Sequence, residues 1–285
     1  MKTYAFASDL DRTLIYSHRV LDQYAYEGEY DLVEVLDERP LSYMSVETKR
    51  SLQTIHQSGW FIPVTTRTTA QYERITFFQQ ELQPEYAVTT NGGCILHHGK
   101  PLEDWQAIVD ERLRECMPVR EMLRAISELP VAAWVKRTRT AEGRFLYLIM
   151  KDEYLSHIPL AELKLWGEER GWQVSLQGRK LYFIPQPLNK WDAVAFIKDR
   201  LQLEYVYGAG DSLLDVGLIR QSDKGFAPRH GEVLDFDPEL EPTAASGMAA
   251  ADEITASVIE QMAKAKSLRF DSRSRRLNDM IVVAF

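Results

Sequence analysis

The sequence predicts an α/β fold in which a doubly wound parallel sheet carries a second, smaller α+β domain. In the first and last thirds of the 285 residues, short apolar runs alternate with helix-like segments, which is typical of parallel sheets with crossover helices. The middle third breaks this alternation with helices and hairpins. We therefore expect a discontinuous core of residues 1–102 and 185–285 and an inserted domain of residues 103–184.

The expected core strands are short apolar runs, as in strands buried on both faces. They comprise residues 4–8, 60–64, 86–90, 204–207 and 224–227. Residues 46–56 have apolar positions near helical spacing, an N-cap in Ser45 and a stop in Gly59, which predicts a helix. Residues 70–82 are expected to form the next helix, and Asn91-Gly92-Gly93 a turn.

Two insertions interrupt this pattern. In the middle third we expect helices over 108–129 and 160–170, a hairpin of 131–135 and 144–150 around Glu142-Gly143, and strands at 172–176 and 181–184. Residues 16–44 form a second, aromatic and acidic insert before the first helix. We expect it to be a flap with a short hairpin around residues 38–40.

Composition excludes several classes of function. Apolar residues make up 45% and the net charge is −8, so a soluble domain is expected and nucleic acid is not favoured as a partner. Basic residues of the last helix are better explained as a solvated face than as a nucleic-acid patch: Lys264, Lys266, Arg269, Arg273, Arg275 and Arg276. No apolar run approaches the ~20 residues of a membrane helix, and the two cysteines cannot form a disulfide framework. A cytoplasmic protein is expected.

Four separate pieces of the chain combine into one candidate site. Ser8-Asp9-Leu10-Asp11-Arg12-Thr13 ends the first strand, Val64-Thr65-Thr66-Arg67 ends the second, Lys190 precedes a helix, and Gly208-Ala209-Gly210-Asp211-Ser212-Leu213-Leu214-Asp215 follows a late strand. Ligands of open α/β sheets bind beyond the carboxyl ends of strands. Carboxylates supply hard oxygen ligands for Mg²⁺, while a hydroxyl and an ammonium suit a phosphoryl group.

The order of these motifs (DxDxT, TxR, Asn-Gly-Gly, Lys, GDSxxD) resembles the haloacid dehalogenase (HAD) superfamily. It is similar to the class IIB branch, with its Cof-type and sucrose-phosphatase-like hydrolases, and the resemblance covers nearly the whole chain. It implies a Rossmann-like core with an inserted α/β cap. It also implies a magnesium-dependent phosphatase that hydrolyses a small phosphorylated metabolite, a sugar phosphate or similar, through an aspartyl-phosphate.

The resemblance also implies roles for individual residues. Asp9 would be the nucleophile and Asp11 the general acid/base. Thr65 would hydrogen-bond the phosphoryl group, and Lys190 would pair with that group and with Asp9. Asp211 would bind Mg²⁺ together with Asp9 and the backbone carbonyl of Asp11, and Asp215 would support or join this shell.

Several assignments stay open. Thr66 and Arg67 are candidate substrate contacts, but Arg67 equally fits a structural salt bridge, and Asn91 fits its turn as well as a substrate contact. A phosphomutase of the phosphomannomutase type is an alternative function, and a non-enzymatic phospho-accepting regulator is a further one. The identity of the substrate and the oligomeric state are not specified by the sequence.

This chain departs from the family pattern at three positions. Arg12 and Thr66 stand where glycines are usual, and Leu214 stands where asparagine is common. In the cap, Arg137 and Arg139 alternate on one expected strand and so share a face. We expect that Arg137, Arg139 or Arg144 contacts an anionic or hydroxyl-rich leaving group. The alternative is a solvated basic hairpin.

Overall fold

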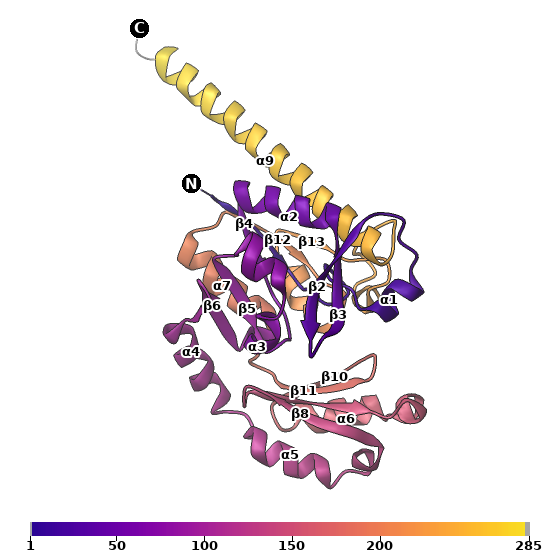
Figure 1. Ribbon diagram of the computed structural model, residues 1–285. Coiled ribbons are helices and arrows are strands. Elements are labelled where there is room, and N and C mark those ends of the chain that lie inside the picture. The colour runs from indigo at the N-terminus through magenta and orange to yellow at the C-terminus, as the bar shows by residue number, and fades with distance from the viewer. Residues whose placement is uncertain (1, 283–285) are drawn as a thin grey trace.

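A parallel sheet forms the centre of the protein in the computed structural model (Figure 1), which describes the backbone of residues 2–282 and the side chains of residues 2–265. Its hydrogen-bonded order is β13-β12-β1-β4. The strands are β1 (Tyr4–Ser8), β4 (Trp60–Pro63), β12 (Tyr205–Ala209) and β13 (Lys224–Phe226). A parallel bridge from Val64 to Val88 continues the sheet into β5 (Tyr86–Thr89), which pairs with β6 (Cys94–His97) and β7 (Lys100–Pro101).

Alternate residues of β1 pack on opposite faces of this sheet. Tyr4 and Phe6 join one buried cluster with α2 (Val46–Ser58) and α9 (Met248–Val282), whereas Ala5 and Ala7 join another with α7 (Lys190–Leu201) and α8 (Val216–Gln221). All five residues of β1 are buried. A strand covered by helices on both faces has this pattern, so the predicted doubly wound sheet is confirmed.

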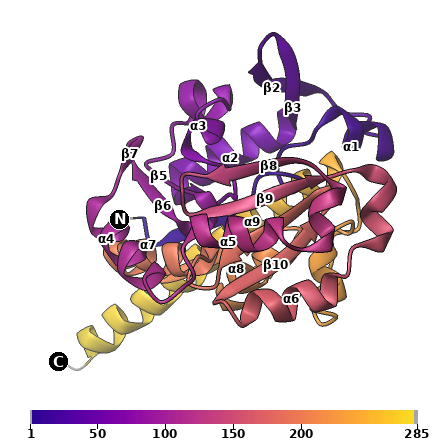
Figure 2. The ribbon, with the colours of Figure 1, turned by 90° about the horizontal axis from the view of Figure 1, so that it is seen from below.

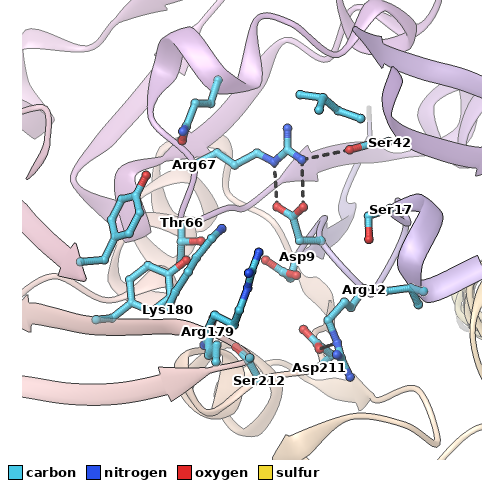
Figure 3. Close-up of a pocket in the computed structure, with 18 of the residues that line it drawn as sticks. Asp9, Arg12, Ser17, Ser42, Thr66, Arg67, Arg179, Lys180, Asp211 and Ser212 are labelled. Atoms are coloured by element: carbon cyan, nitrogen blue, oxygen red, sulfur yellow. Dashed lines mark hydrogen bonds and ion pairs between the residues drawn. The ribbon is translucent and has the colours of Figure 1, made fainter. Parts of the chain in front are cut away.

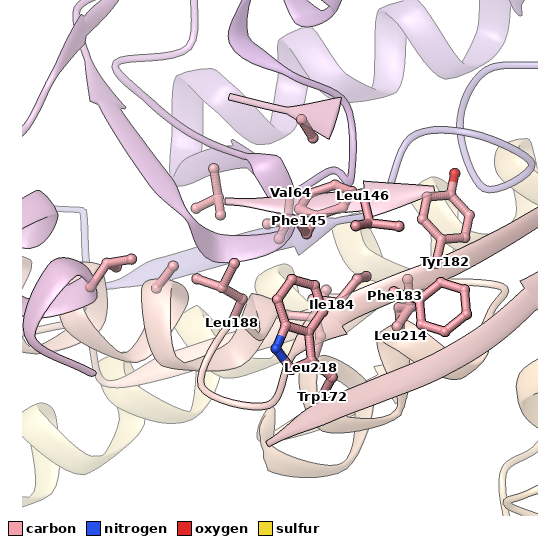
Figure 4. Close-up of a cluster of buried hydrophobic side chains, with 14 of the residues drawn as sticks. Val64, Phe145, Leu146, Trp172, Tyr182, Phe183, Ile184, Leu188, Leu214 and Leu218 are labelled. Atoms are coloured by element: carbon pink, nitrogen blue, oxygen red, sulfur yellow. The ribbon is translucent and has the colours of Figure 1, made fainter. Parts of the chain in front are cut away.

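A second, antiparallel sheet forms the cap, in the order β10-β11-β9-β8. Its strands are β8 (Val135–Ala141), β9 (Phe145–Met150), β10 (Trp172–Gln177) and β11 (Lys180–Pro185). The cap sheet faces the core, and α5 (Val119–Ser127) lies on its far side, as does α6 (Leu160–Glu168) (Figures 1 and 2). The buried cluster in Figure 4 runs from core residues such as Val64 and Leu218 to the cap residues Phe145 and Trp172.

The flap predicted for residues 16–44 is present. It consists of the short α1 (His18–Gln23) and a hairpin of β2 (Tyr30–Leu36) and β3 (Arg39–Ser45). Asp37 and Glu38 form its turn with positive φ. The remaining helical segments are α3 (Thr69–Tyr72), α4 (Glu103–Leu113), the π-helix η1 (Phe77–Leu82) and the 3₁₀ segments η2 (Thr90–Gly92), η3 (Pro130–Trp134), η4 (Asp152–His157), η5 (Leu213–Asp215) and η6 (Glu232–Asp235).

The helix predicted over residues 70–82 is wrong in its middle. The helix α3 ends at Tyr72 and the π-helix begins at Phe77. Between them, Ile75 forms a bridge with Glu34 of the flap, and Thr76 donates a hydrogen bond to the carbonyl of Val33. Contact with the flap therefore replaces regular helical bonding, which local propensity cannot anticipate.

Two expectations in the cap are also wrong. The helix predicted over residues 108–129 is divided into α4 and α5, because Pro118 lacks an amide donor and disfavours a helical residue before it. The strand predicted over residues 131–135 is the 3₁₀ segment η3, which begins at Pro130. The partner strand β8 starts at Val135, and the hairpin turn falls at Glu142-Gly143 as expected.

No helix in the described part of the chain is long and apolar enough to cross a membrane. Of the basic residues noted near the C-terminus, the side chains of Lys266, Arg269, Arg273, Arg275 and Arg276 lie outside the described residues.

One carboxylate of α9 ties this helix to the flap and to α2. Asp252 accepts hydrogen bonds from Tyr26 (2.7 Å), Thr48 (2.8 Å) and Ser45. We predict that Asp252→Ala lowers the free energy of unfolding by about 1–3 kcal/mol, because several donors lose a charged acceptor. Urea denaturation measures this. The control is Glu260→Ala, in an exposed pair with Lys264 on the same helix, expected to cost about 0.5 kcal/mol. Equal effects would contradict the assignment.

Candidate active site

The predicted site residues meet at the carboxyl ends of three neighbouring strands. Asp9 follows β1, Thr65 follows β4 and Asp211 follows β12. Parallel pairing places these ends at one edge of the sheet, on the side that faces the cap (Figures 1 and 3). This is where an open α/β sheet binds ligands.

A buried lysine links two of the carboxylates. The Lys190 Nζ lies 2.5 Å from the Asp9 Oδ1 and 2.6 Å from the Asp215 Oδ1. Lys190 is 1% exposed and Asp215 is not exposed at all. Lys190 is the first residue of α7, whose N-cap is Asn189: its side chain accepts a hydrogen bond from the Asp192 amide at 2.8 Å. The start of the helix therefore determines where the ammonium lies.

The loop after β12 contains two of the acids, Asp211 and Asp215. Asp215 accepts hydrogen bonds from the amide (2.9 Å) and the hydroxyl (2.7 Å) of Ser212. A Cβ atom on Gly210 would lie 2.3 Å from the Cβ of Asp215. Glycine is therefore required at position 210, because only its missing side chain allows Asp215 to fold back under the loop.

Burial and mutual repulsion alter the titration of this cluster. Burial raises the pKa of Asp9 to about 7, although Lys190 opposes the shift and Asp215 adds to it. Burial, reinforced by Asp9 and Asp215, also raises the pKa of Asp211 well above its usual value. Burial alone would lower the pKa of Lys190, but the Asp215 and Asp9 carboxylates outweigh it and raise that pKa.

This arrangement fits a metal site. Asp9, Asp211 and Asp215 each offer a carboxylate oxygen, and these oxygens lie within 4.8 Å of one another. Three buried carboxylates in this space repel each other, and a divalent cation would relieve that repulsion. An all-oxygen donor set suits a hard cation such as Mg²⁺ or Ca²⁺.

Asp11 points away from this carboxylate cluster. Its two oxygens accept hydrogen bonds from the Arg67 Nε (2.7 Å) and Nη2 (2.8 Å). Although desolvation would raise the pKa of Asp11, the bidentate guanidinium prevails and lowers it to about 2. The side chain is half exposed to the cavity. Sequence reasoning left Arg67 open between a phosphate contact and a salt bridge, and in the structure it forms a salt bridge.

Sequence reasoning missed Glu34, which completes this network from the flap. Glu34 is 1% exposed and accepts hydrogen bonds from Arg67 (2.8 Å), Arg74 (2.9 Å) and Ser42 (2.7 Å). The only local signal was an acidic residue inside the apolar run Leu32-Val33-Glu34-Val35. Its partners are set by tertiary contacts that the sequence does not display.

Thr65, Thr66 and Asn91 occupy different environments. Thr65 is fully buried, and its hydroxyl accepts a hydrogen bond from the Arg67 amide at 3.1 Å. Thr66 lines the cavity, whereas neither Thr65 nor Asn91 does. The Asn91 side chain donates to the carbonyl of Leu188 at 3.0 Å. This contact joins two loops and favours the turn interpretation of Asn91.

Two departures from the family pattern have a structural explanation. Arg12 adopts a φ of 65°, the left-handed region that favours glycine. His230 donates to the Arg12 carbonyl at 2.9 Å, and the Arg12 Nε lies 2.9 Å from Asp211. Leu214 is buried in the cluster of Figure 4 with cap residues such as Phe183. Apolar packing against the cap thus replaces the polar contact of asparagine.

A cavity of about 470 Å³ lies between the core and the cap. The core supplies Asp9, Asp11 and Asp211 to its lining. The cap sheet supplies residues such as Lys180 and Tyr182, so both domains enclose the site (Figure 3).

The cap arginines singled out from the sequence do not line this cavity. Arg137 and Arg139 lie in register with Ile149 and Tyr147, which do line it. Arg144 instead pairs with Asp110 at 2.8 Å.

The tip of the β8–β9 hairpin is bonded to the core. Glu142 accepts hydrogen bonds from the Thr69 amide (2.7 Å) and the Thr90 hydroxyl (2.6 Å). The cap is therefore fastened at one corner beside the site.

Comparisons with known proteins agree with this architecture. A sucrose phosphatase from Synechocystis sp. PCC6803, solved with sucrose and phosphate, is 19% identical, has a TM-score of 0.61, and is matched over 92% of this chain and 98% of that one. A HAD/Cof-like hydrolase from Plasmodium vivax is 11% identical with a TM-score of 0.64, over 90% of this chain and 95% of that one. A HAD subclass IIB sugar phosphatase is 12% identical with a TM-score of 0.60, over 91% and 100%. These likenesses support the fold.

A search of curated proteins gives no match. The family model for sucrose-6F-phosphate phosphohydrolase, however, matches residues 2–260. The predicted resemblance is confirmed: the chain belongs to the sucrose-6F-phosphate phosphohydrolase family.

Proposed function

We propose that this phosphatase hydrolyses a small phosphorylated sugar through an aspartyl-phosphate on Asp9, with Mg²⁺ as its cofactor. The observation that carries the proposal is the buried group of Asp9, Asp211, Asp215 and Lys190 at one end of the enclosed cavity. The sucrose and phosphate in the related Synechocystis phosphatase support a sugar ester. The cavity of about 470 Å³ suits a ligand of that size.

In the first half-reaction, a carboxylate oxygen of Asp9 attacks phosphorus and the bond to the sugar oxygen breaks. Asp11 gives a proton to the departing oxygen. Lys190 pairs with Asp9 and with the phosphoryl group, which reduces the repulsion between two anions. Thr65, Thr66, Arg67 and Asn91 are our remaining candidates for substrate contacts.

In the second half-reaction, Asp11 takes a proton from water as the water oxygen attacks phosphorus. The bond between Asp9 and phosphorus breaks, which restores the carboxylate and yields inorganic phosphate. A pKa of about 2 keeps Asp11 ionised while Arg67 holds it, but it makes the carboxylate a weak base. Both the donated and the accepted proton need a higher pKa, so we infer that substrate binding loosens the contact of Asp11 with Arg67.

Magnesium would be held by Asp9, Asp211 and the backbone carbonyl of Asp11, with Asp215 supporting or joining this shell. Bound there, it supplies positive charge that neutralises the phosphate and the nucleophile together. We also propose the domain division expected from the sequence, a core of residues 1–102 and 185–285 and a cap of residues 103–184. A cytoplasmic location remains a prediction.

We predict that Asp9→Asn abolishes phosphate release from 4-nitrophenyl phosphate, because an amide has the shape of the carboxylate but is not a nucleophile. Lys190 keeps Asp215 as its partner, so the variant should fold. Phosphate release and circular dichroism measure the two properties. The nucleophile assignment is wrong if a folded Asp9→Asn protein keeps a tenth of the wild-type kcat.

Metal removal gives a second prediction. EDTA should abolish hydrolysis, and Mg²⁺ in excess of the chelator should restore it, because the three carboxylates bind substrate poorly without a cation. The measurement is the initial rate against free Mg²⁺ concentration. Full activity in metal-free buffer would refute the cofactor assignment.

A third prediction concerns the two hydrogen bonds that the Arg67 guanidinium donates to Asp11. Arg67→Lys keeps the charge but loses the bidentate contact, so we expect kcat to fall by about tenfold or more. The pKa of Asp11 should rise from about 2 towards its usual 3.8. Carboxyl ¹³C NMR titration of the free enzyme measures this shift, because the acidic limb of an activity profile would follow Asp9, whose pKa of about 7 lies above that of Asp11.

The matched control is Arg74→Lys. Arg74 contacts Glu34 at 2.9 Å in the same network but not Asp11, so in this variant the pKa of Asp11 should stay at about 2. Identical shifts in both variants would show that the network acts only on stability.

A further inference from the structure

Most cations that line the cavity are paired with carboxylates. Among the described residues seven lysines and arginines line it. Five form ion pairs with an acid: Arg12 with Asp211, Arg67 with Asp11, Arg74 with Glu34, Arg179 with Asp152, and Lys190 with Asp9. Lys180 on the cap and Arg19 on α1 have no carboxylate partner in the described part of the chain. Both are exposed residues that line the cavity, so an anion that enters the cavity can reach them.

Lys180 lies on the cap side of the cavity that contains Asp9 and Asp11. It is the first residue of β11, and the core residue Arg67 lines the same cavity (Figure 3). Its Nζ lies 5.8 Å from the centre of the Tyr147 ring. Tyr182, with Asp11 and Tyr147 adding, raises the pKa of Lys180, so the ammonium is charged at neutral pH.

Gln177, a neighbour of Lys180, has a side-chain donor without an acceptor among the described residues. Gln177 lies directly across the β10–β11 hairpin from Lys180 and lines the same cavity. The Nε2 of Gln177 is buried and has no hydrogen-bond partner. An unsatisfied buried donor costs about 1–3 kcal/mol, and a bound acceptor would remove that cost. An ammonium and an amide donor side by side suit an anionic group with several oxygens.

Glu232 is the lining carboxylate without an ion pair among the described residues. Burial raises its pKa, and Arg12, which pairs with Asp211, opposes this shift. Glu232 forms no ion pair with Lys180 among the described residues. A phosphoryl group bound at Asp9 and Lys190 would lie on the core side of the cavity, whereas Lys180 comes from the cap sheet.

We infer that the substrate carries a second anionic group, a carboxylate or a second phosphate, on its sugar portion, and that Lys180 binds this group with help from Gln177. This inference rests on the proposed function and narrows the substrate to phosphorylated sugar acids or sugar bisphosphates. Lys180 is then a specificity-determining residue. Arg19, on the flap side, is a second cation that lines the same cavity.

The test compares esters that differ in the presence of the second anion. The pairs are 6-phosphogluconate against sorbitol 6-phosphate, both open-chain, and fructose 1,6-bisphosphate against fructose 6-phosphate; the first tests a carboxylate and the second a phosphate. The member of each pair that carries the second anion is called the charged member. For the wild-type enzyme with Mg²⁺, kcat/KM should be higher for the charged member of at least one pair by about tenfold or more, as one charged hydrogen bond provides. In Lys180→Gln that ratio should fall to about one, and Lys180→Arg should restore most of it.

The control is Arg137→Gln, an exposed cation on the same sheet that does not line the cavity, which should keep the wild-type ratio. A wild-type enzyme that prefers the charged member of neither pair overturns the inference. So does an unchanged ratio in Lys180→Gln, whether both rates fall together or neither falls.

A failure of the proposed function is separately visible. In that case 4-nitrophenyl phosphate and all four sugar esters release no phosphate with Mg²⁺. Calorimetric binding of the same pairs to Asp9→Asn then decides the anion site by itself. Tighter binding of the charged member that is lost in the Asp9→Asn, Lys180→Gln double variant supports the inference, and equal binding of both members overturns it.

Discussion

The rest of the site depends on the two ion pairs that the ammonium of Lys190 forms. The ammonium lies between Asp9 and Asp215 where all three side chains are buried, and an unpaired carboxylate there would be strongly destabilised. Three features of the backbone bring these charges together. The N-cap of α7 fixes the position of the Lys190 ammonium, the missing side chain of Gly210 leaves room for Asp215, and parallel pairing of β1 with β12 brings Asp9 to the same point. The charges are therefore assembled by backbone geometry before any ligand arrives.

The flap acts on the other acid. Glu34 holds Arg67, and Arg67 holds Asp11 away from the carboxylate cluster. The proposed nucleophile and the proposed general acid/base, two residues apart in the sequence, thus have opposite environments. Burial raises the pKa of Asp9, while a guanidinium lowers that of Asp11. Separating the titration of two neighbouring carboxyl groups by environment is how one site can divide such roles.

The sequence was informative where a residue is positioned by its own strand end, and uninformative where its partner comes from a distant insert. The parallel sheet, its central strands and the family could be predicted, because apolar runs and the motifs around Asp9 and Asp211 are local signals. The convergence of Asp9, Asp211, Asp215 and Lys190 follows from them. Glu34 and Lys180 could not be found, since the first depends on how the flap docks and the second on which face of the cap meets the core. The break after Tyr72 has the same cause, namely a bridge from Ile75 to Glu34.

The pairing of β1 with β12 has a consequence for biosynthesis. Asp9 leaves the ribosome early, but Lys190 follows 181 positions later. At about 5–20 residues per second, this interval is roughly 10–40 s. During this interval β1 can pair only with β4, and the Asp9 carboxylate lacks Lys190 as its counterion. The whole cap is made during the same interval and has to fold while the sheet below it is incomplete. Strand pairing over such a separation is intrinsically slow, so the nascent chain exposes one edge of β1 until β12 emerges.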